Sequence, residues 1–450
     1  MNKSAIYQHR RNRLALQIRE STGGGIAIIS TAPEYMRNRD SDFPYRHDSD
    51  FFYLTGFDEP DATLVLIVSK NTHESHLFCR PRDPDREIWD GIRLGPERAA
   101  KTLGIDFAHS NLDLDRQLTS ALSDQKALYI RLAENAETDR QVRHWINQVR
   151  KNSRSGINPP SEFHDIEAIV HEMRLFKDMH EIDIMRRAAK ISAQAHARAM
   201  RACKPGMREH HLEAELLHEF RNSGAQSVAY NSIVAAGANS CILHYRASSA
   251  ELRSGDLCLI DAGCELDGYA SDITRTFPVN GRFSPPQRAL YDITLASQEA
   301  AIAQTCPGNT FIQPHEAAVR VLTQGLLDEK LLSLKDLGSL ENAIETEAYR
   351  RFYMHRTSHW LGMDVHDVGS YREQSIAIPA KDKQWRILQA GMVLTIEPGL
   401  YIRPADDIPK EFWNIGIRIE DDAVINESGC ELISRDAPVK ADDIEELMRL

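Results

Sequence analysis

Two aspartates on a predicted β-hairpin are the first candidates for chemistry in this sequence. The apolar run Leu257–Ile260 leads into Asp261, and Asp267-Gly268 marks a tight turn before the strand-like run that follows Asp272. If the turn centres on Asp267-Gly268, both aspartates point to one face as diagonal neighbours across the hairpin. Two carboxylates in apolar surroundings need a cation between them, unless the hairpin is solvated and both lie on its surface.

A second stretch repeats this pattern and adds two more acids. Residues 391–399 align without a gap with residues 255–263, so that Glu397 stands where Asp261 stands. Residues 415–420 then alternate, which places Arg418 and Glu420 on the face opposite to three isoleucines. The helix-like segments before each stretch recur in the same order. We infer an internal duplication with an acidic site between its two halves.

Histidines supply the other candidate ligands and proton carriers. His355, His359 and His366 lie close together in the sequence, and His244 is a fourth candidate. A lone histidine is usually a hydrogen-bonded structural residue, but three of them beside these acids favour a ligand or catalytic role. His355 and His359 are separated as in HExxH but lack its glutamate, which excludes a zincin-type site.

Charge balance indicates how many metal ions the site would hold. Two divalent cations would neutralise the four carboxylates of Asp261, Asp272, Glu397 and Glu420, whereas one would leave net negative charge in a partly buried place. Two ions bridged by carboxylates, with a bridging hydroxide as the nucleophile, are a known arrangement for hydrolysis. Oxygen donors with one imidazole suit Mn²⁺, and Co²⁺, Fe²⁺ or Zn²⁺ are alternatives. The sequence therefore predicts two Mn²⁺ ions per chain.

The length of 450 residues predicts two domains. We expect an α/β (α+β) architecture with a first domain of residues 1–174 and a second of residues 175–450. In the first domain we expect helices near 5–20 and 134–149, and strands near 25–30, 51–55, 62–69, 76–79 and 127–132. The polar segment 151–160 is the best linker by composition.

The second domain must hold the candidate ligands. Its first half is predicted to have helices near 177–203 and 208–222, then strands near 228–235 and through the hairpin of Asp261 and Asp272. Its second half is predicted to have helices near 285–305 and 313–328, followed by the histidine-rich stretch and the strands of Glu397 and Glu420.

Composition excludes several classes of function. The net charge of −12 argues against nucleic acid as a partner, and no apolar run approaches the roughly 20 residues of a membrane span. The Arg-rich N-terminus has no apolar signal core, so an amphipathic first helix is favoured over a secretion signal or a transit peptide. Seven cysteines, without a close CxxC pair, favour reduced thiols and a cytoplasmic protein.

The stretches that carry the candidate ligands resemble the pita-bread metallopeptidases, which include methionine aminopeptidase, prolidase and aminopeptidase P. Segments 358–369, 395–401 and 416–422 are similar to aminopeptidase P in particular, and Asp50–Phe57 resembles part of its N-terminal domain. The resemblance covers the whole chain. It implies an N-terminal creatinase/prolidase-like α/β domain and a C-terminal pita-bread domain with an internal pseudo-twofold duplication.

The resemblance also implies how five residues share two Mn²⁺ ions. Asp261 and Asp272 would bind one ion, and Asp272 and Glu420 would bridge to the second. His359 and Glu397 would complete the second ion. Glu397 is also implied to be the proton shuttle for the bridging hydroxide.

The remaining implied roles concern the substrate, a peptide with an N-terminal Xaa-Pro. His366 and His244 would hydrogen-bond the scissile carbonyl and the tetrahedral intermediate, and His355 would line the proline pocket. Arg418 would orient the acids and the proline side. Members of the family are commonly dimers or tetramers joined through the first domain, which makes Trp89 a candidate for reaching a neighbouring active site.

Two alternatives stay open from the sequence. A prolidase, restricted to Xaa-Pro dipeptides, would use the same five ligands. A non-catalytic peptide-binding module on this fold would have no need for all of them, so the expected activity is that of an Xaa-Pro aminopeptidase.

Overall fold

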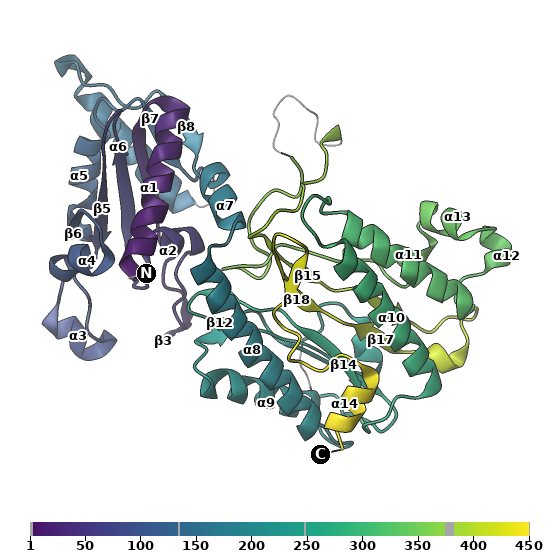
Figure 1. The fold of residues 1–450 in the computed structure, drawn as a ribbon. Coiled ribbons are helices and arrows are strands. Elements are labelled where there is room, and N and C mark those ends of the chain that lie inside the picture. Colours follow the sequence, from purple (N-terminus) through teal and green to yellow (C-terminus); the bar gives the residue numbers. More distant parts are fainter. Residues whose placement is uncertain (1–2, 134–135, 247–248, 374–381, 450) are drawn as a thin grey trace. The chain divides into compact units, whose positions relative to one another are not determined.

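Two units, Met1–Arg174 and Leu175–Leu450, make up the chain in the computed structural model, and each has its own core. The structure describes residues 3–133, 136–246, 249–373 and 382–449. Figure 1 labels the helices and strands by the names used below. Among the described residues, none of the helices combines the length and the apolar character that crossing a membrane requires.

A mixed six-stranded sheet forms the centre of the first unit (Figure 1). Its strand order is β6-β5-β4-β1-β7-β8; β1 is antiparallel to β4 and parallel to β7. The strands are β1 (Gly25–Ser30), β4 (Thr63–Val68), β5 (His73–Cys79), β6 (Phe107–Ser110), β7 (Ala127–Ile130) and β8 (Glu162–Asp165). A short hairpin joins β2 (Met36–Asn38) and β3 (Ser41–Asp42). The helices are α1 (Lys3–Thr22), α2 (Ser49–Thr55), α3 (Pro84–Asp90), α4 (Pro96–Leu103), α5 (Leu114–Ala121), α6 (Ala136–Lys151) and α7 (Glu167–Leu175).

The strand predicted at residues 51–55 is wrong, because this run belongs to helix α2. The carboxylate of Asp48 accepts a hydrogen bond from the backbone N–H of Phe51 and caps the helix start, and Gly56 ends the helix in the left-handed conformation. Both capping residues lie outside the apolar run. A five-residue apolar run is too short to distinguish a helix from a strand by periodicity.

The interpretation of residues 151–160 as an interdomain linker is also wrong. Helix α6 runs to Lys151, and β8 then pairs in parallel with β7, so the segment connects a helix and a strand of the same unit. Polar composition marks an exposed loop, whether it joins two elements or two domains.

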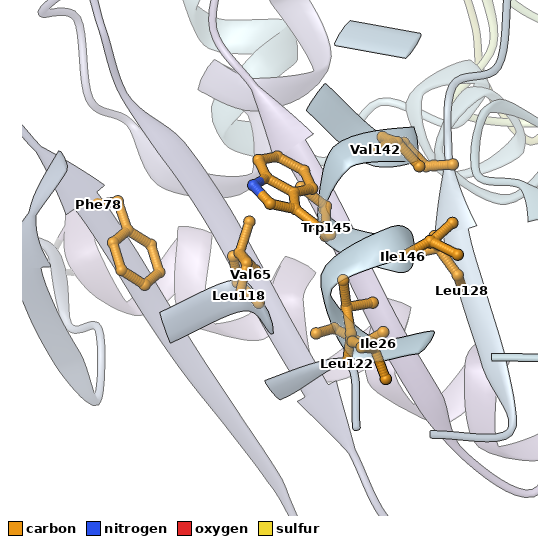
Figure 2. Close-up of a cluster of buried hydrophobic side chains, with 12 residues drawn as sticks. Ile26, Val65, Phe78, Leu118, Leu122, Leu128, Val142, Trp145 and Ile146 are labelled. Atoms are coloured by element: carbon orange, nitrogen blue, oxygen red, sulfur yellow. The ribbon is translucent and has the colours of Figure 1, made fainter. Parts of the chain in front are cut away.

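Helices α5 and α6 cover one face of this sheet through a cluster of buried apolar side chains (Figure 2). Trp145 of α6 packs among strand residues that include Val65 and Phe78, and its indole N–H donates to Asp115 Oδ1 at 2.6 Å. Trp145 is 1% exposed, whereas Trp89 on α3 is 83% exposed. The periodicity of the sequence left the place of Trp89 open, and the structure puts it on the surface.

Two similar groups of helices and strands make up most of the second unit. The first group has α8 (Met179–Ala202) and α9 (Glu209–Asn222), then β9 (Ser227–Val228), β10 (Ile233–Ala236), β11 (Leu257–Asp261), β12 (Cys264–Leu266), β13 (Tyr269–Ala270) and β14 (Thr274–Pro278). The second has α10 (Pro285–Gln304), α11 (Gln313–Asp328), α12 (Leu334–Leu337) and α13 (Leu340–Glu345), then β15 (Val393–Ile396), β16 (Gly399–Ile402), β17 (Ile415–Arg418), β18 (Asp421–Ile425), β19 (Cys430–Leu432) and α14 (Ala441–Leu447).

The predicted duplication is confirmed by these elements. In each half a helix pair precedes an antiparallel strand pair, β11 with β14 and β15 with β18. Gly255 and Gly391 both precede the first strand of their pair in the left-handed region, at φ values of 94° and 89°. The predicted hairpin register is confirmed as well, because Asp261 lies opposite Thr274. The predicted strand near 228–235 is interrupted and forms β9 and β10.

Removal of the Trp145 indole should destabilise the first unit. Trp145→Ala deletes a buried ring and its hydrogen bond to Asp115, so the free energy of unfolding should fall by about 3–5 kcal/mol. Leu112→Ala removes an apolar side chain from an exposed position and should change it by less than about 0.5 kcal/mol. Urea unfolding followed by circular dichroism would test this, and equal losses in the two variants would contradict it.

Candidate active site

A cavity of about 1020 Å³ in the second unit brings the predicted site residues together. The nine residues proposed from the sequence all line it: His244, Asp261, Asp272, His355, His359, His366, Glu397, Arg418 and Glu420. The four acids lie at corresponding places in the two halves. Asp261 ends β11 and Asp272 precedes β14, while Glu397 follows β15 and Glu420 precedes β18. The duplicated strand pairs therefore place two acids from each half in one cavity.

Three of these groups lie close enough to share one metal ion. Ligand atoms of Asp272, His359 and Glu420 all lie within 4.8 Å of one another, and all three residues are buried. His359 Nδ1 donates to the carbonyl of Trp360 at 3.0 Å, which leaves Nε2 free to accept a metal. That Nε2 lies 3.5 Å from Asp272 Oδ2 and 3.7 Å from Glu397 Oε1. This set of carboxylate and imidazole donors fits a divalent cation.

Asp261 joins this group through Tyr230 and Arg418. The phenol oxygen of Tyr230 contacts a carboxylate oxygen of both Asp261 and Asp272. A phenol has one hydrogen to donate, so Tyr230 satisfies one carboxylate at a time. Arg418 Nη2 donates to the other oxygen of Asp261 at 2.6 Å. Burial, followed by the charges of Asp261, Asp272 and Glu420, raises the pKa of Tyr230 and keeps it protonated.

The shifted pKa values reflect the burial of several ionisable groups in one cavity. Burial raises the pKa of Asp272 and of Glu420, and it raises the pKa of Glu397 to about 7. Burial alone would lower the pKa of His359, but the hydrogen bond with Asp272 and the charge of Glu397 raise it to about 9. A divalent cation at these atoms would favour the charged acids and the neutral imidazole instead.

Arg418 also organises the part of the cavity around His355. Its Nη1 donates to the phenol oxygen of Tyr401 at 3.0 Å, and that oxygen lies 2.8 Å from His355 Nε2. His355 Nδ1 donates to the carbonyl of Arg356 at 2.8 Å, so Nε2 accepts the hydrogen of Tyr401. Burial, and then the charge of Arg418, lowers the pKa of His355 to about 3, and the imidazole is therefore neutral.

His366 and His244 line the more accessible part of the cavity. The ring of His366 stacks on that of His359 with 3.9 Å between centroids, and both His366 and His244 are exposed. Partial burial, and then the neighbouring His359, lowers the pKa of His366 to about 4. His366 is therefore a neutral group at neutral pH, free to donate one hydrogen bond to a bound ligand.

Buried ion pairs fix the backbone behind these side chains. Arg275 is fully buried; it donates to the carbonyl of Glu420 at 2.6 Å and to Asp421 Oδ1 at 2.8 Å. Lys177 pairs with Asp367 at 2.8 Å, directly beside His366. Both pairs are shielded from water, so breaking either would leave an uncompensated buried charge.

The sequence analysis missed three side chains that contact the acids or Arg418. Tyr230 lies in the interruption between β9 and β10, where a continuous strand was predicted, and no local pattern marks it. Thr274 donates to Glu420 Oε2 at 2.6 Å, and its place opposite Asp261 could have been read from the predicted register. Tyr401 lies four residues after Glu397, in a stretch where the sequence analysis named Glu397 as the only candidate site residue.

Two family models match the chain. The model described as metallopeptidase family M24 matches residues 183–427, which include every residue discussed as a ligand. The model described as aminopeptidase P, N-terminal domain, matches residues 7–129.

Known proteins of similar sequence and structure extend over almost the whole chain. It is 47% identical over 443 residues to the Xaa-Pro aminopeptidase of Escherichia coli, covering 98% of this chain and 97% of the relative. It is similar to the structure of Pseudomonas aeruginosa aminopeptidase PepP, with a TM-score of 0.94, 47% identity and coverage of 100% and 99%. It is also similar to a zinc-substituted E. coli aminopeptidase P in complex with product, with a TM-score of 0.93, 46% identity and coverage of 99% and 98%.

Two stacked histidines allow a sharp test of the metal site. His359→Ala removes an imidazole whose Nε2 faces Asp272 and Glu397, so Mn²⁺ binding should weaken by at least roughly tenfold. His366→Ala removes the ring stacked on it and should leave Mn²⁺ affinity nearly unchanged. Calorimetric titration of Mn²⁺ into both variants would separate the two roles. Equal loss of affinity in both would refute the assignment.

Proposed function

Because the chain belongs to metallopeptidase family M24, with an N-terminal domain of the aminopeptidase P type, we propose that this metallo-aminopeptidase removes the first residue of peptides whose second residue is proline. The observation that carries the proposal is the convergence of five ligand-type side chains with neutral histidines in one cavity. The near-full-length similarity to an Xaa-Pro aminopeptidase supports it.

We propose a centre of two Mn²⁺ ions, held by Asp261, Asp272, His359, Glu397 and Glu420, with Co²⁺, Fe²⁺ or Zn²⁺ as alternatives. When bound, two such ions would supply a bridging hydroxide as nucleophile, whose charge together with the four carboxylates would balance both ions and the Arg418 guanidinium. The position of His359 Nε2 between Asp272 and Glu397, together with the raised pKa values of the acids, supports a site built for cations.

The chain's own residues would handle the protons and the developing charge. Glu397, a buried carboxylate beside His359, would accept a proton from the nucleophile and later release it to the departing amine. His366, which is neutral, and His244 line the accessible side of the same cavity, where each could donate a hydrogen bond to the scissile carbonyl as negative charge builds on it.

His355 would face the proline ring. Its imidazole is neutral and fixed by Tyr401 on one side and the carbonyl of Arg356 on the other, so it offers a rigid, flat surface. Proline has no backbone N–H to satisfy, and a pocket without a matching acceptor therefore suits it. Arg418 would orient both the acids and the proline side, since it donates hydrogen bonds to Asp261 and to Tyr401.

The arrangement favours an aminopeptidase over a prolidase. A dipeptidase needs a free cation next to the metal ligands, where the carboxylate of the second residue lies. Arg418 is the cation nearest to the acids, and its hydrogen bonds to Asp261, Tyr401 and Thr274 occupy it. A cavity of about 1020 Å³ also exceeds what a dipeptide fills.

The first unit would make contacts between subunits of a homodimer or homotetramer. Ile88, Trp89 and Ile92 are 81%, 83% and 76% exposed, a cluster of apolar side chains that is unusual on a free surface. We propose that Trp89 reaches toward the active site of a neighbouring subunit. All seven cysteines are free, which supports a reducing compartment such as the cytoplasm.

Replacement of Glu397 tests the metal centre and the proton transfer together. Glu397→Ala should bring turnover of an Xaa-Pro peptide below detection, because it removes a ligand and the proton carrier. Glu427→Ala, at an exposed position, should retain full activity. Elemental analysis of the active protein should give two divalent ions per chain; one ion per fully active chain would disprove the dinuclear centre.

Peptide length distinguishes the two enzyme classes. A dipeptide, a tripeptide and a nonapeptide that all begin Gly-Pro should release glycine, with kcat/KM for the longer two at least equal to that for the dipeptide. A mass-spectrometric time course with added Mn²⁺ would follow the loss of each peptide. If the dipeptide alone disappears, the protein is a prolidase.

A further inference from the structure

We propose that Arg356 and Arg372 form a carboxylate-binding subsite for the residue that follows the proline, so that the enzyme prefers peptides of the form Xaa-Pro-Glu or Xaa-Pro-Asp. The inference rests on the proposed Xaa-Pro aminopeptidase activity and adds a substrate class to it. Both arginines line the same cavity as the metal ligands.

The two guanidinium groups are held on one aromatic ring. The Cζ atom of Arg372 lies 3.8 Å from the ring centroid of Trp385, and that of Arg356 lies 4.9 Å from it. Arg372 and Trp385 are paired as an isolated antiparallel bridge, and the ring of Phe311 stacks on that of Trp385 with 6.4 Å between ring centroids. A stacked guanidinium keeps its N–H groups directed outward, where they can donate to a ligand.

Neither arginine has a carboxylate partner among the described residues. Arg372 Nη1 donates to the carbonyl of Lys383, and the described part of the chain contains no ion pair for either Arg356 or Arg372. The undescribed residues 247–248 follow Arg246 in the sequence, and the undescribed residues 374–381 lie between Arg372 and Trp385. Neither segment contains an aspartate or a glutamate. A third arginine, Arg246, lines the same cavity. Cations gathered this way repel one another and are stabilised by an anion.

This concentration of cations contrasts with the rest of the protein. The chain carries a net charge of −12, and the other cation of the cavity, Arg418, is paired with Asp261. The negative charge of the acids and the positive charge of Arg356 and Arg372, which line the same cavity, would orient a peptide whose amino terminus meets the acids and whose carboxylate meets the arginines.

The adjacency of Arg356 to His355 favours a subsite next to the proline. Arg356 directly follows His355, the residue proposed to face the proline ring. The carbonyl of Arg356 accepts a hydrogen bond from His355 Nδ1. An extended peptide advances by about 3.3–3.6 Å per residue, so the third residue of a substrate lies one step from the proline. A glutamate or aspartate there, or the terminal carboxylate of a tripeptide, can accept hydrogen bonds from a guanidinium.

Competition among third residues tests the subsite. In peptides Gly-Pro-Xaa-Ala-Ala with glutamate, glutamine or lysine as Xaa, kcat/KM should be roughly tenfold higher for glutamate than for glutamine, and lower again for lysine. Arg356→Gln combined with Arg372→Gln should reduce this preference to about one. Arg356→Glu with Arg372→Glu should reverse it toward lysine. Arg282→Gln, an exposed arginine outside the cavity, should leave the preference unchanged.

Further measurements show whether the bound carboxylate comes from a side chain or from the peptide terminus. They also separate the subsite hypothesis from the proposed aminopeptidase function. Gly-Pro-Ala with a free terminus should be cleaved faster than its amide if the terminal carboxylate also occupies the subsite, and equally fast if side chains alone do. The product-like dipeptide Pro-Glu should inhibit more strongly than Pro-Gln, and this difference should vanish in the double glutamine variant. Equal cleavage of the glutamate, glutamine and lysine peptides would disprove the subsite while leaving the proposed function intact. No cleavage of any Gly-Pro peptide would instead disprove the proposed function.

Discussion

Four carboxylates brought into one largely buried cavity are the constraint on which the rest of the second unit depends. Each of them would favour the neutral form if buried alone, and their mutual repulsion adds to that cost. The fold offsets part of it with hydrogen-bond donors from both halves: Arg418 and Tyr230 reach Asp261, and Thr274 reaches Glu420. The remaining negative charge gives the cavity its affinity for cations.

The duplication explains how a four-acid site can form from local sequence patterns. Each half supplies a strand that ends in an acid and a later strand with a second acid, so one local pattern used twice produces a four-acid site. The halves meet where Thr274 forms an isolated bridge with Glu420. Arg275 then fixes the backbone of Glu420 from a fully buried position, which ties the second half to the first.

The sequence was sufficient for features that repeat or have a strict period. The helices, the hairpin register at Asp261 and the duplication followed from alternation, turn residues and alignment of the chain with itself. It was insufficient where distant groups decide the outcome. Residues 51–55 became a helix because capping residues outside the apolar run satisfied its ends. Tyr230 reached the acids from a break in a strand, and the pairing of Arg356 and Arg372 through Trp385 depends on a cross-chain approach that no local pattern encodes.

The single hydrogen of Tyr230 has a consequence for how the cavity captures an ion. The phenol keeps the oxygens of Asp261 and Asp272 close to each other within the folded chain. The conformational entropy of gathering these ligands is therefore lost during folding rather than at the moment of capture. An arriving ion meets a preorganised pair of oxygens and has only to displace the hydrogen bond of the phenol. Replacing Tyr230 with phenylalanine would leave the charges unchanged but shift that entropic cost to the binding step, so the residue tunes affinity without being a ligand.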